Sequence, residues 1–231
     1  MGRSFRFLLN FAWANLSAIF GFAAIVIAGC YLTGVPSNTE TGNLFETYYA
    51  MFPTMLLLIL FLYAFALCTN NLNLGLSMGA RRTDFFWALQ GIMVFYSVVC
   101  WLLQLFMSAF PAIANWEVRD RWALLNLFDG RVWAFPLICL VLMVLGCLSG
   151  MLMVKHKIIG TILITVSIII MVVVTVFMLL FADARMGEPF REAGLGWVFT
   201  VLPKVMVAVL AVGAVGGEFL IWKVIQRYIV R

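Results

Sequence analysis

The sequence predicts an all-α, polytopic integral membrane protein with six transmembrane helices and both termini in the cytoplasm. Composition carries most of this prediction. Of the 231 residues, 65% are hydrophobic and 11% are charged, against about 45–50% and about 25% in ordinary soluble domains. The mean hydropathy is +1.09. A soluble chain of this size could not bury so much apolar surface, whereas a lipid bilayer accommodates it.

Six stretches are long and apolar enough to cross the hydrocarbon as helices, which takes about 20 residues at about 1.5 Å each. Each stretch is continuously apolar rather than alternating, and this favours helix over strand. The connecting segments are too short to form separate domains, so residues 1–231 are expected to be a single transmembrane domain. The expected spans are residues 8–32, 48–68, 86–110, 132–154, 158–182 and 197–222.

The distribution of Lys and Arg predicts the orientation. With both termini inside, nine of these residues face the cytoplasm and five face outward. The formal net charge is +5, yet no long basic run exists, so the basic residues are interpreted as membrane-flanking cations and not as a nucleic-acid site. The nine expected inside are Arg3, Arg6, Arg81, Arg82, Lys155, Lys157, Lys223, Arg227 and Arg231.

Enzyme chemistry finds little support in the residues. The only histidine, His156, lies between Lys155 and Lys157, and a metal cluster or a catalytic triad would need more grouped ligands or partners. The five cysteines lie in apolar stretches and form no CxxC pair. The sequence therefore predicts no catalytic, cofactor or metal site in this chain.

Charged residues inside a span are the usual mark of ion-coupled transport. Two candidates, Lys204 and Glu218, lie in the last predicted span. They are 14 residues apart, or about 21 Å along a helix, so they cannot pair, and each lies near an end where its side chain can reach water. An ion-coupled secondary transporter stays open as an alternative, as does a passive membrane immunity or assembly subunit of the same topology.

Two glycines in the last span, Gly213 and Gly217, form a GxxxG motif that predicts close helix packing. Packing within the bundle and contact with a second subunit both remain possible for this face.

The connection between the second and third spans, residues 69–85, is the most informative segment. It is expected to face water, yet it contains four large apolar residues. Arg81 and Arg82 follow them. Apolar groups bordered by Asn, Arg and Asp indicate a surface that docks another protein. The apolar residues are Leu72, Leu74, Leu76 and Met78.

Residues 76–86 read LSMGARRTDFF. This segment resembles the L-S-x-G-x-[ST/A]-R-[RK]-x-[DE]-F-F motif in the small permease subunits of type 2 ABC transporters. A second passage, from Gly146 and Gly150 to Gly160, is similar to the G-x-x-x-G…R-F-G-x-x-G of the same subunits, although residues 155–157 read KHK. The residue-level resemblance covers about 30 positions, and the six-span pattern is similar along the whole chain.

The resemblance implies a transport subunit that dimerises with itself or a sibling permease and is driven by a separate cytoplasmic ATP-binding cassette subunit. That partner would bind ATP and Mg and hydrolyse the nucleotide. The 69–85 connection would be a coupling loop in a groove of the partner. The residues implied to contact it are Gly75, Leu76, Gly79, Ala80, Arg81, Arg82, Asp84 and Phe85.

The resemblance further implies that residues 183–203 form a re-entrant outer hairpin before the last span, with an ordinary loop and a bend at Pro203 as the alternative. The implied location is a cell membrane, the bacterial plasma membrane. Because the predicted pathway is walled by apolar residues without buried charge, the expected activity is export of a hydrophobic or amphipathic substrate: a peptide, a lipid-like molecule or a drug.

Overall fold

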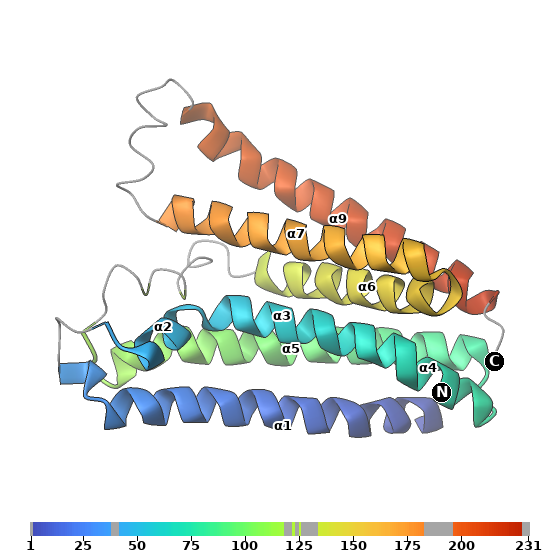
Figure 1. The fold of residues 1–231 in the computed structure, drawn as a ribbon, viewed down its shortest axis with the longest axis horizontal. Helices are drawn as coiled ribbons and strands as arrows, with labels where there is room; N and C mark the ends of the chain where they lie inside the picture. Colours follow the sequence, from blue (N-terminus) through green and yellow to red (C-terminus); the bar gives the residue numbers. More distant parts are fainter. Residues whose placement is uncertain are drawn as a thin grey trace.

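The computed structural model describes residues 2–37, 42–117, 122, 125, 134–182 and 196–227. Within these residues every regular element is a helix, and the long helices lie side by side along one axis (Figure 1). The elements in chain order are α1 (Gly2–Leu32), the 3-10 turn η1 (Val35–Ser37), α2 (Leu44–Ala50), α3 (Phe52–Ala66), the π-helical turn η2 (Leu67–Asn71), α4 (Leu72–Ser77), α5 (Arg82–Ile113), α6 (Ala134–Lys155), α7 (Lys157–Ala182) and α9 (Gly196–Gln226).

Four helical stretches in the described part of the chain are long and apolar enough to cross a membrane. α7 and α9 run over 26 and 31 residues and lie on the far side of α6 from α3 and α5 (Figure 1). The predicted helical class is therefore confirmed, together with several helices that could span a bilayer. The four stretches are Ser4–Leu32, Phe52–Ser77, Arg82–Ile113 and Phe135–Lys155.

The bundle has two distinct ends. At one end lie the start of α1, the short helix α4, the α6–α7 turn and the end of α9 (Figure 1); we call this the α4 end. The opposite end carries η1, α2 and the end of α5, and we call it the α2 end. The first and last described helices thus begin and finish at the same end of the molecule.

The second predicted span differs most from the structure. Residues 48–50 belong to the separate helix α2, and α3 begins beside Pro53, which suits the first turn of a helix. At the other end the helical path continues through η2 and α4 to Ser77. The expected 17-residue loop is consequently helical except at residues 78–81.

Burial explains this extension. Leu72 and Leu76 lie four residues apart, on one face of α4, and both are buried. The expectation that they face water was wrong, because the helix turns them onto the core. Leu74 and Met78, on the other side, are exposed.

α6 is the central helix and packs against α3, α5, α7 and α9. Its approach to α3 is especially close. A Cβ atom built on Gly146 would lie 2.7 Å from the carbonyl oxygen of Phe61, and one on Gly150 would lie 2.7 Å from that of Phe65. Only glycine lets the two backbones come so near. The GxxxG spacing that fixes this interface is thus in α6.

Candidate functional site

The turn between α4 and α5 closes α4 in a Schellman motif. The N–H of Gly79 donates to the carbonyl of Leu76 at 3.1 Å, and the N–H of Ala80 donates to that of Gly75 at 3.2 Å. Gly79 has φ = +84°, a left-handed conformation that a residue with a Cβ rarely adopts. The positive φ angle explains why position 79 is glycine, and this residue lets the chain reverse direction between α4 and α5.

Three residues implied to contact an ATPase are buried inside the chain. Phe85 is fully buried, and its ring lies against Gly75, where an added Cβ would be 2.7 Å from the Cε2 atom of Phe85. Leu76 is buried beside them. These residues pack α4 onto α5. Because they are buried, they position the turn but do not themselves lie at its surface.

The remaining residues of this segment form a compact exposed surface. Ala80 and Asp84 are half-buried, while Gly79, Arg81 and Arg82 are exposed. Beside them Met78 is 68% exposed and Leu74 is 41% exposed. We define the α4–α5 turn surface as Leu74, Met78, Gly79, Arg81 and Arg82. It combines two large apolar side chains with two guanidinium groups at the α4 end.

Arg82 also reaches another helix. Its Nη1 atom donates to the main-chain oxygen of Gln226 at 2.7 Å. Gln226 is the last residue of α9, where carbonyl groups lack an intrahelical partner. The turn surface is therefore linked directly to the end of α9. The two residues are 144 positions apart, and sequence reasoning did not predict the contact.

Of the two glycines in the predicted GxxxG face of α9, only Gly217 packs closely against another helix in the described part of the chain. A Cβ on Gly217 would meet the Cγ1 atom of Val144 in α6 at 2.2 Å, whereas one on Gly213 would have nothing within 4 Å. Gly217 therefore packs within the bundle and Gly213 faces open space. Of the two alternatives for this face, packing within the bundle thus applies at Gly217, and contact with a second subunit stays a prediction for Gly213.

The other residues predicted from charge and turn content have varied positions. Glu218 is half-buried in α9 and accepts a hydrogen bond from Nε2 of Gln90 in α5. Residues 196–203 of the predicted re-entrant segment, including Pro203, belong to α9, and residues 183–195 lie outside the described residues. Among the described residues, no group of three His, Cys, Asp or Glu side chains could hold a metal ion.

An aromatic cluster lies at the α2 end, and sequence reasoning did not identify it. The rings of Tyr49 and Trp122 stack at 4.8 Å, and Trp116 packs against both of them. Glu46, which lies between the first two predicted spans, is fully buried here and accepts a hydrogen bond from Nε1 of Trp122 at 3.2 Å. The cluster joins α2 to the end of α5 and to the segment that follows.

Tyr49 also replaces a hydrogen-bond donor that is missing from α5. The carbonyl of Met107 would normally accept from the N–H four residues later, but residue 111 is proline and has none. The Tyr49 hydroxyl donates to that carbonyl at 2.7 Å instead. The buried tyrosine thus allows a proline in the last turns of a long helix.

We expect Tyr49→Phe to destabilise the protein by about 1–3 kcal/mol, because the buried Met107 carbonyl loses its donor. In a Pro111→Ala background the helix regains its own N–H, and the cost of Tyr49→Phe should fall below about 1 kcal/mol. Thermal unfolding of the four variants in detergent measures this coupling. Equal costs in the two backgrounds would contradict the role assigned to Tyr49.

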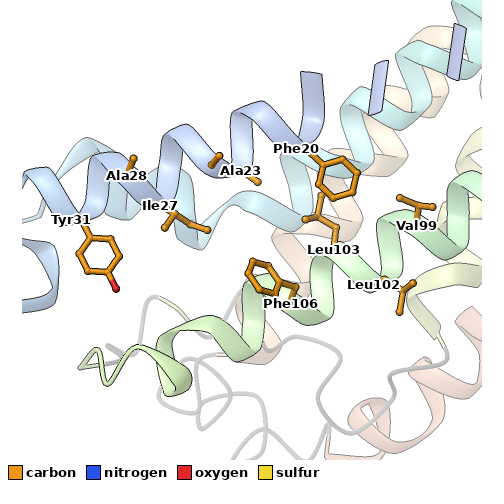
Figure 2. A pocket seen from close by; sticks show the side chains of 10 residues that line it. Phe20, Ala23, Ile27, Ala28, Tyr31, Val99, Leu102, Leu103 and Phe106 are labelled. Atoms are coloured by element: carbon orange, nitrogen blue, oxygen red, sulfur yellow. The ribbon is translucent and has the colours of Figure 1, made fainter. Parts of the chain in front are cut away.

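An apolar groove of about 920 Å³ lies between α1 and α5. Small residues of α1, Ala23, Ala24 and Ala28, leave space that Phe20 and Phe106 border (Figure 2). The Tyr31 hydroxyl is the one polar side-chain group among the lining residues. Both walls belong to helices apolar enough to span a membrane, so the groove suits an apolar chain and not a charged solute.

The fold and these sites define an all-helical protein with several long apolar helices, compatible with a multi-pass membrane protein. Comparisons with protein-family models, with curated proteins and with solved structures find no match.

Proposed function

We propose that this chain is the transmembrane permease subunit of an ATP-driven ABC exporter for hydrophobic or amphipathic substrates. A separate cytoplasmic ATPase would supply the energy, and a second permease subunit, identical or a sibling, would complete the pathway. The observation that carries the proposal is the α4–α5 turn surface. It lies where the candidate span Phe52–Ser77 ends and the next begins at Arg82, and it exposes Met78 and Leu74 next to Arg81 and Arg82.

The chemistry of this surface fits protein docking. Large exposed apolar side chains bordered by charge are typical of interfaces, where apolar groups fill the centre and guanidinium groups bind at the rim. The complementary partner surface would be an apolar pocket with carboxylates around it. A rigid Schellman turn suits the task, because a fixed loop loses little entropy on binding.

Topology supports the same proposal. In it, α7 and α9 are the fifth and sixth spans, and the α4 end faces the cytoplasm. That end contains the α4–α5 turn, Lys155 and Lys157 at the α6–α7 turn, and Lys223 near the end of α9. Because cytoplasmic ends are enriched in Lys and Arg, this clustering at one end favours that orientation.

The groove between α1 and α5 supports an apolar cargo. Its volume of about 920 Å³ lies in the range of small-molecule sites, about 300–1,000 Å³. An acyl chain or an apolar peptide side chain could enter it from the bilayer, since the lining of the groove and the core of the bilayer are both apolar.

Filling the groove should weaken binding of an apolar probe. We expect Ala24→Phe with Ala28→Phe to reduce the affinity for a fluorescent acyl-chain probe by at least about tenfold, a loss of about 1.4 kcal/mol. The matched control is Ile25→Phe, on the same helix but outside the lining. Fluorescence titration in nanodiscs measures both variants, and equal affinities would argue against the groove as the cargo site.

The direct test is purification of the chain from its own membranes in mild detergent. An ATP-binding cassette ATPase should co-purify, and vesicles containing the complex should transport an amphipathic fluorophore only when ATP is supplied. A complex that transports nothing on ATP addition would indicate a passive assembly subunit.

One observation favours a second candidate function. The half-buried Glu218 with its Gln90 partner is the kind of polar pair that an ion-coupled secondary transporter uses. In that case Glu218→Gln would abolish ion-driven uptake, because the neutral side chain cannot carry the exchangeable charge. A permease driven by ATP should keep its transport in the same variant.

A further inference from the structure

α5 and α9 are joined at the α4 end by three side-chain contacts in regular register. Arg82 bonds the main-chain oxygen of Gln226, Phe86 packs on Trp222, and Gln90 bonds Glu218. The positions advance by four residues on α5 while they recede by four on α9. Since residues four apart lie on one helical face, the contacts form an antiparallel ladder with three rungs.

Each rung uses a different interaction. The Arg82 guanidinium makes a charge-assisted hydrogen bond to a helix C-terminus, where a cation is favoured. The Phe86 and Trp222 rings meet edge to face, with centroids 4.8 Å apart and an interplanar angle of 68°. The third rung joins an amide donor to a carboxylate on half-buried side chains, where such a bond is stronger than in water.

The ladder ends after the third rung. The next position on the same face of α5 is Val94, which is 53% exposed, and Val98 after it is 42% exposed. On α9 the positions that continue the register are Ala214 and Leu210, two half-buried apolar residues. α9 diverges from α5 toward the α2 end (Figure 1).

The three rungs thus hold α9 to α5 at the α4 end. The rungs span eight residues of α5, about 12 Å, while Gly196 at the start of α9 lies 22 residues beyond Glu218, about 33 Å. A small displacement at the ladder therefore becomes a larger one at the far end of the helix. α6 supports α9 through contacts such as Val144 on Gly217.

We propose that this ladder makes the tilt of α9 depend on the position of Arg82, so that a movement of the α4–α5 turn surface is transmitted to the α2 end of the last helix. Arg82, Gln90 and Glu218 are positioning residues in this device. The transmission itself is a property of the single chain. Only the source of the movement, an ATPase at the turn surface, rests on the proposed function.

The experiment is a distance measurement between spin labels on the chain alone in nanodiscs. Labels at Val98 of α5 and Val212 of α9 use two exposed positions beyond the ladder. The five native cysteines are buried, and the unsubstituted chain serves as the labelling blank. Arg82→Leu should shift the distance distribution to longer values and broaden it.

Two matched controls separate the ladder from general perturbation. Arg81→Leu removes the same charge from the neighbouring exposed residue and should leave the distribution unchanged. For the third rung, Glu218→Leu should act as Arg82→Leu does, while Glu218→Gln should not, because the amide oxygen still accepts from Gln90. The double variant Gln90→Leu, Glu218→Leu should restore the narrow distance distribution, because two leucines can pack against each other. It also keeps the third rung testable if Glu218→Leu alone does not fold.

A distribution in Arg82→Leu that matches the parent would overturn the proposal, and so would equal shifts in Arg82→Leu and Arg81→Leu. Because no ATPase is present, this result is independent of the permease assignment. If the Arg82→Leu result is as expected but no ATPase is found to bind the chain, the coupling between Arg82 and α9 stands. Only the proposal that an ATPase moves the turn surface is then lost.

Discussion

Gly146→Leu is expected to unfold the protein or to lower its stability by more than about 3 kcal/mol, at the upper end of overpacking costs. An added Cβ would lie 2.7 Å from the Phe61 carbonyl oxygen, and this neighbour is backbone that cannot change rotamer. Because α6 is the central helix, separating it from α3 would disturb every interface that it forms. Thermal unfolding in detergent measures the loss.

The matched control is Gly213→Leu. The space around its missing Cβ is open, and leucine has the higher helix propensity, so its stability should stay within about 0.5 kcal/mol of the parent. The two substitutions are chemically identical and both lie in long helices. Similar losses in both would contradict the assignment of the close interface to α6 and α3.

Met78→Glu with Arg81→Glu is expected to weaken association with the proposed ATPase partner at least about 100-fold, or about 2.8 kcal/mol, since the central Met78 and the rim residue Arg81 are both lost from the interface. The pair replaces the apolar centre and a basic rim by carboxylates, which would face the carboxylates expected on the partner. It leaves Arg82, and with it the contact to α9, in place. Co-purification and a binding titration with the isolated partner measure the effect.

Lys157→Glu is the control for this pair. Lys157 is exposed in the α6–α7 turn at the same end of the bundle and undergoes the same reversal of charge, so it tests for a general effect on topology. It should retain the ATPase. Undiminished co-purification of the Met78, Arg81 variant would count against the turn surface as the docking site.

The helical class followed from composition, because a chain this apolar can satisfy its backbone in lipid only through helices or a closed barrel. The end of the second helix could not be predicted as reliably. The continuous apolar run stops before Asn70, Asn71 and Asn73, residues that favour turns, although Leu72 and Leu76 beyond them have helical spacing. That spacing was the available signal, since two leucines four residues apart mark a buried helical face.

Interfaces were harder to predict than helices. Two of the long helices, α6 and α9, contain a GxxxG motif, and spacing alone does not say which face meets a neighbour. The backbone approach at Gly146 and Gly150 required three-dimensional information. Three-dimensional information was also needed for Tyr49, whose hydroxyl donates to a carbonyl 58 residues away in the chain. The register of the ladder likewise becomes visible only when α5 and α9 are aligned.

The π-helical turn at Leu67–Asn71 has a consequence for the turn surface. Such a turn holds one residue more than an α-helical turn, so everything after it is rotated by about 100° relative to an uninterrupted helix. Without the extra residue Asn71 would take the inward position that Leu72 occupies, so the side chain that faces the core is set by the turn that precedes α4. The side chains that the α4–α5 turn surface exposes thus depend on the number of residues in the π-helical turn as well as on the chemistry of the surface residues.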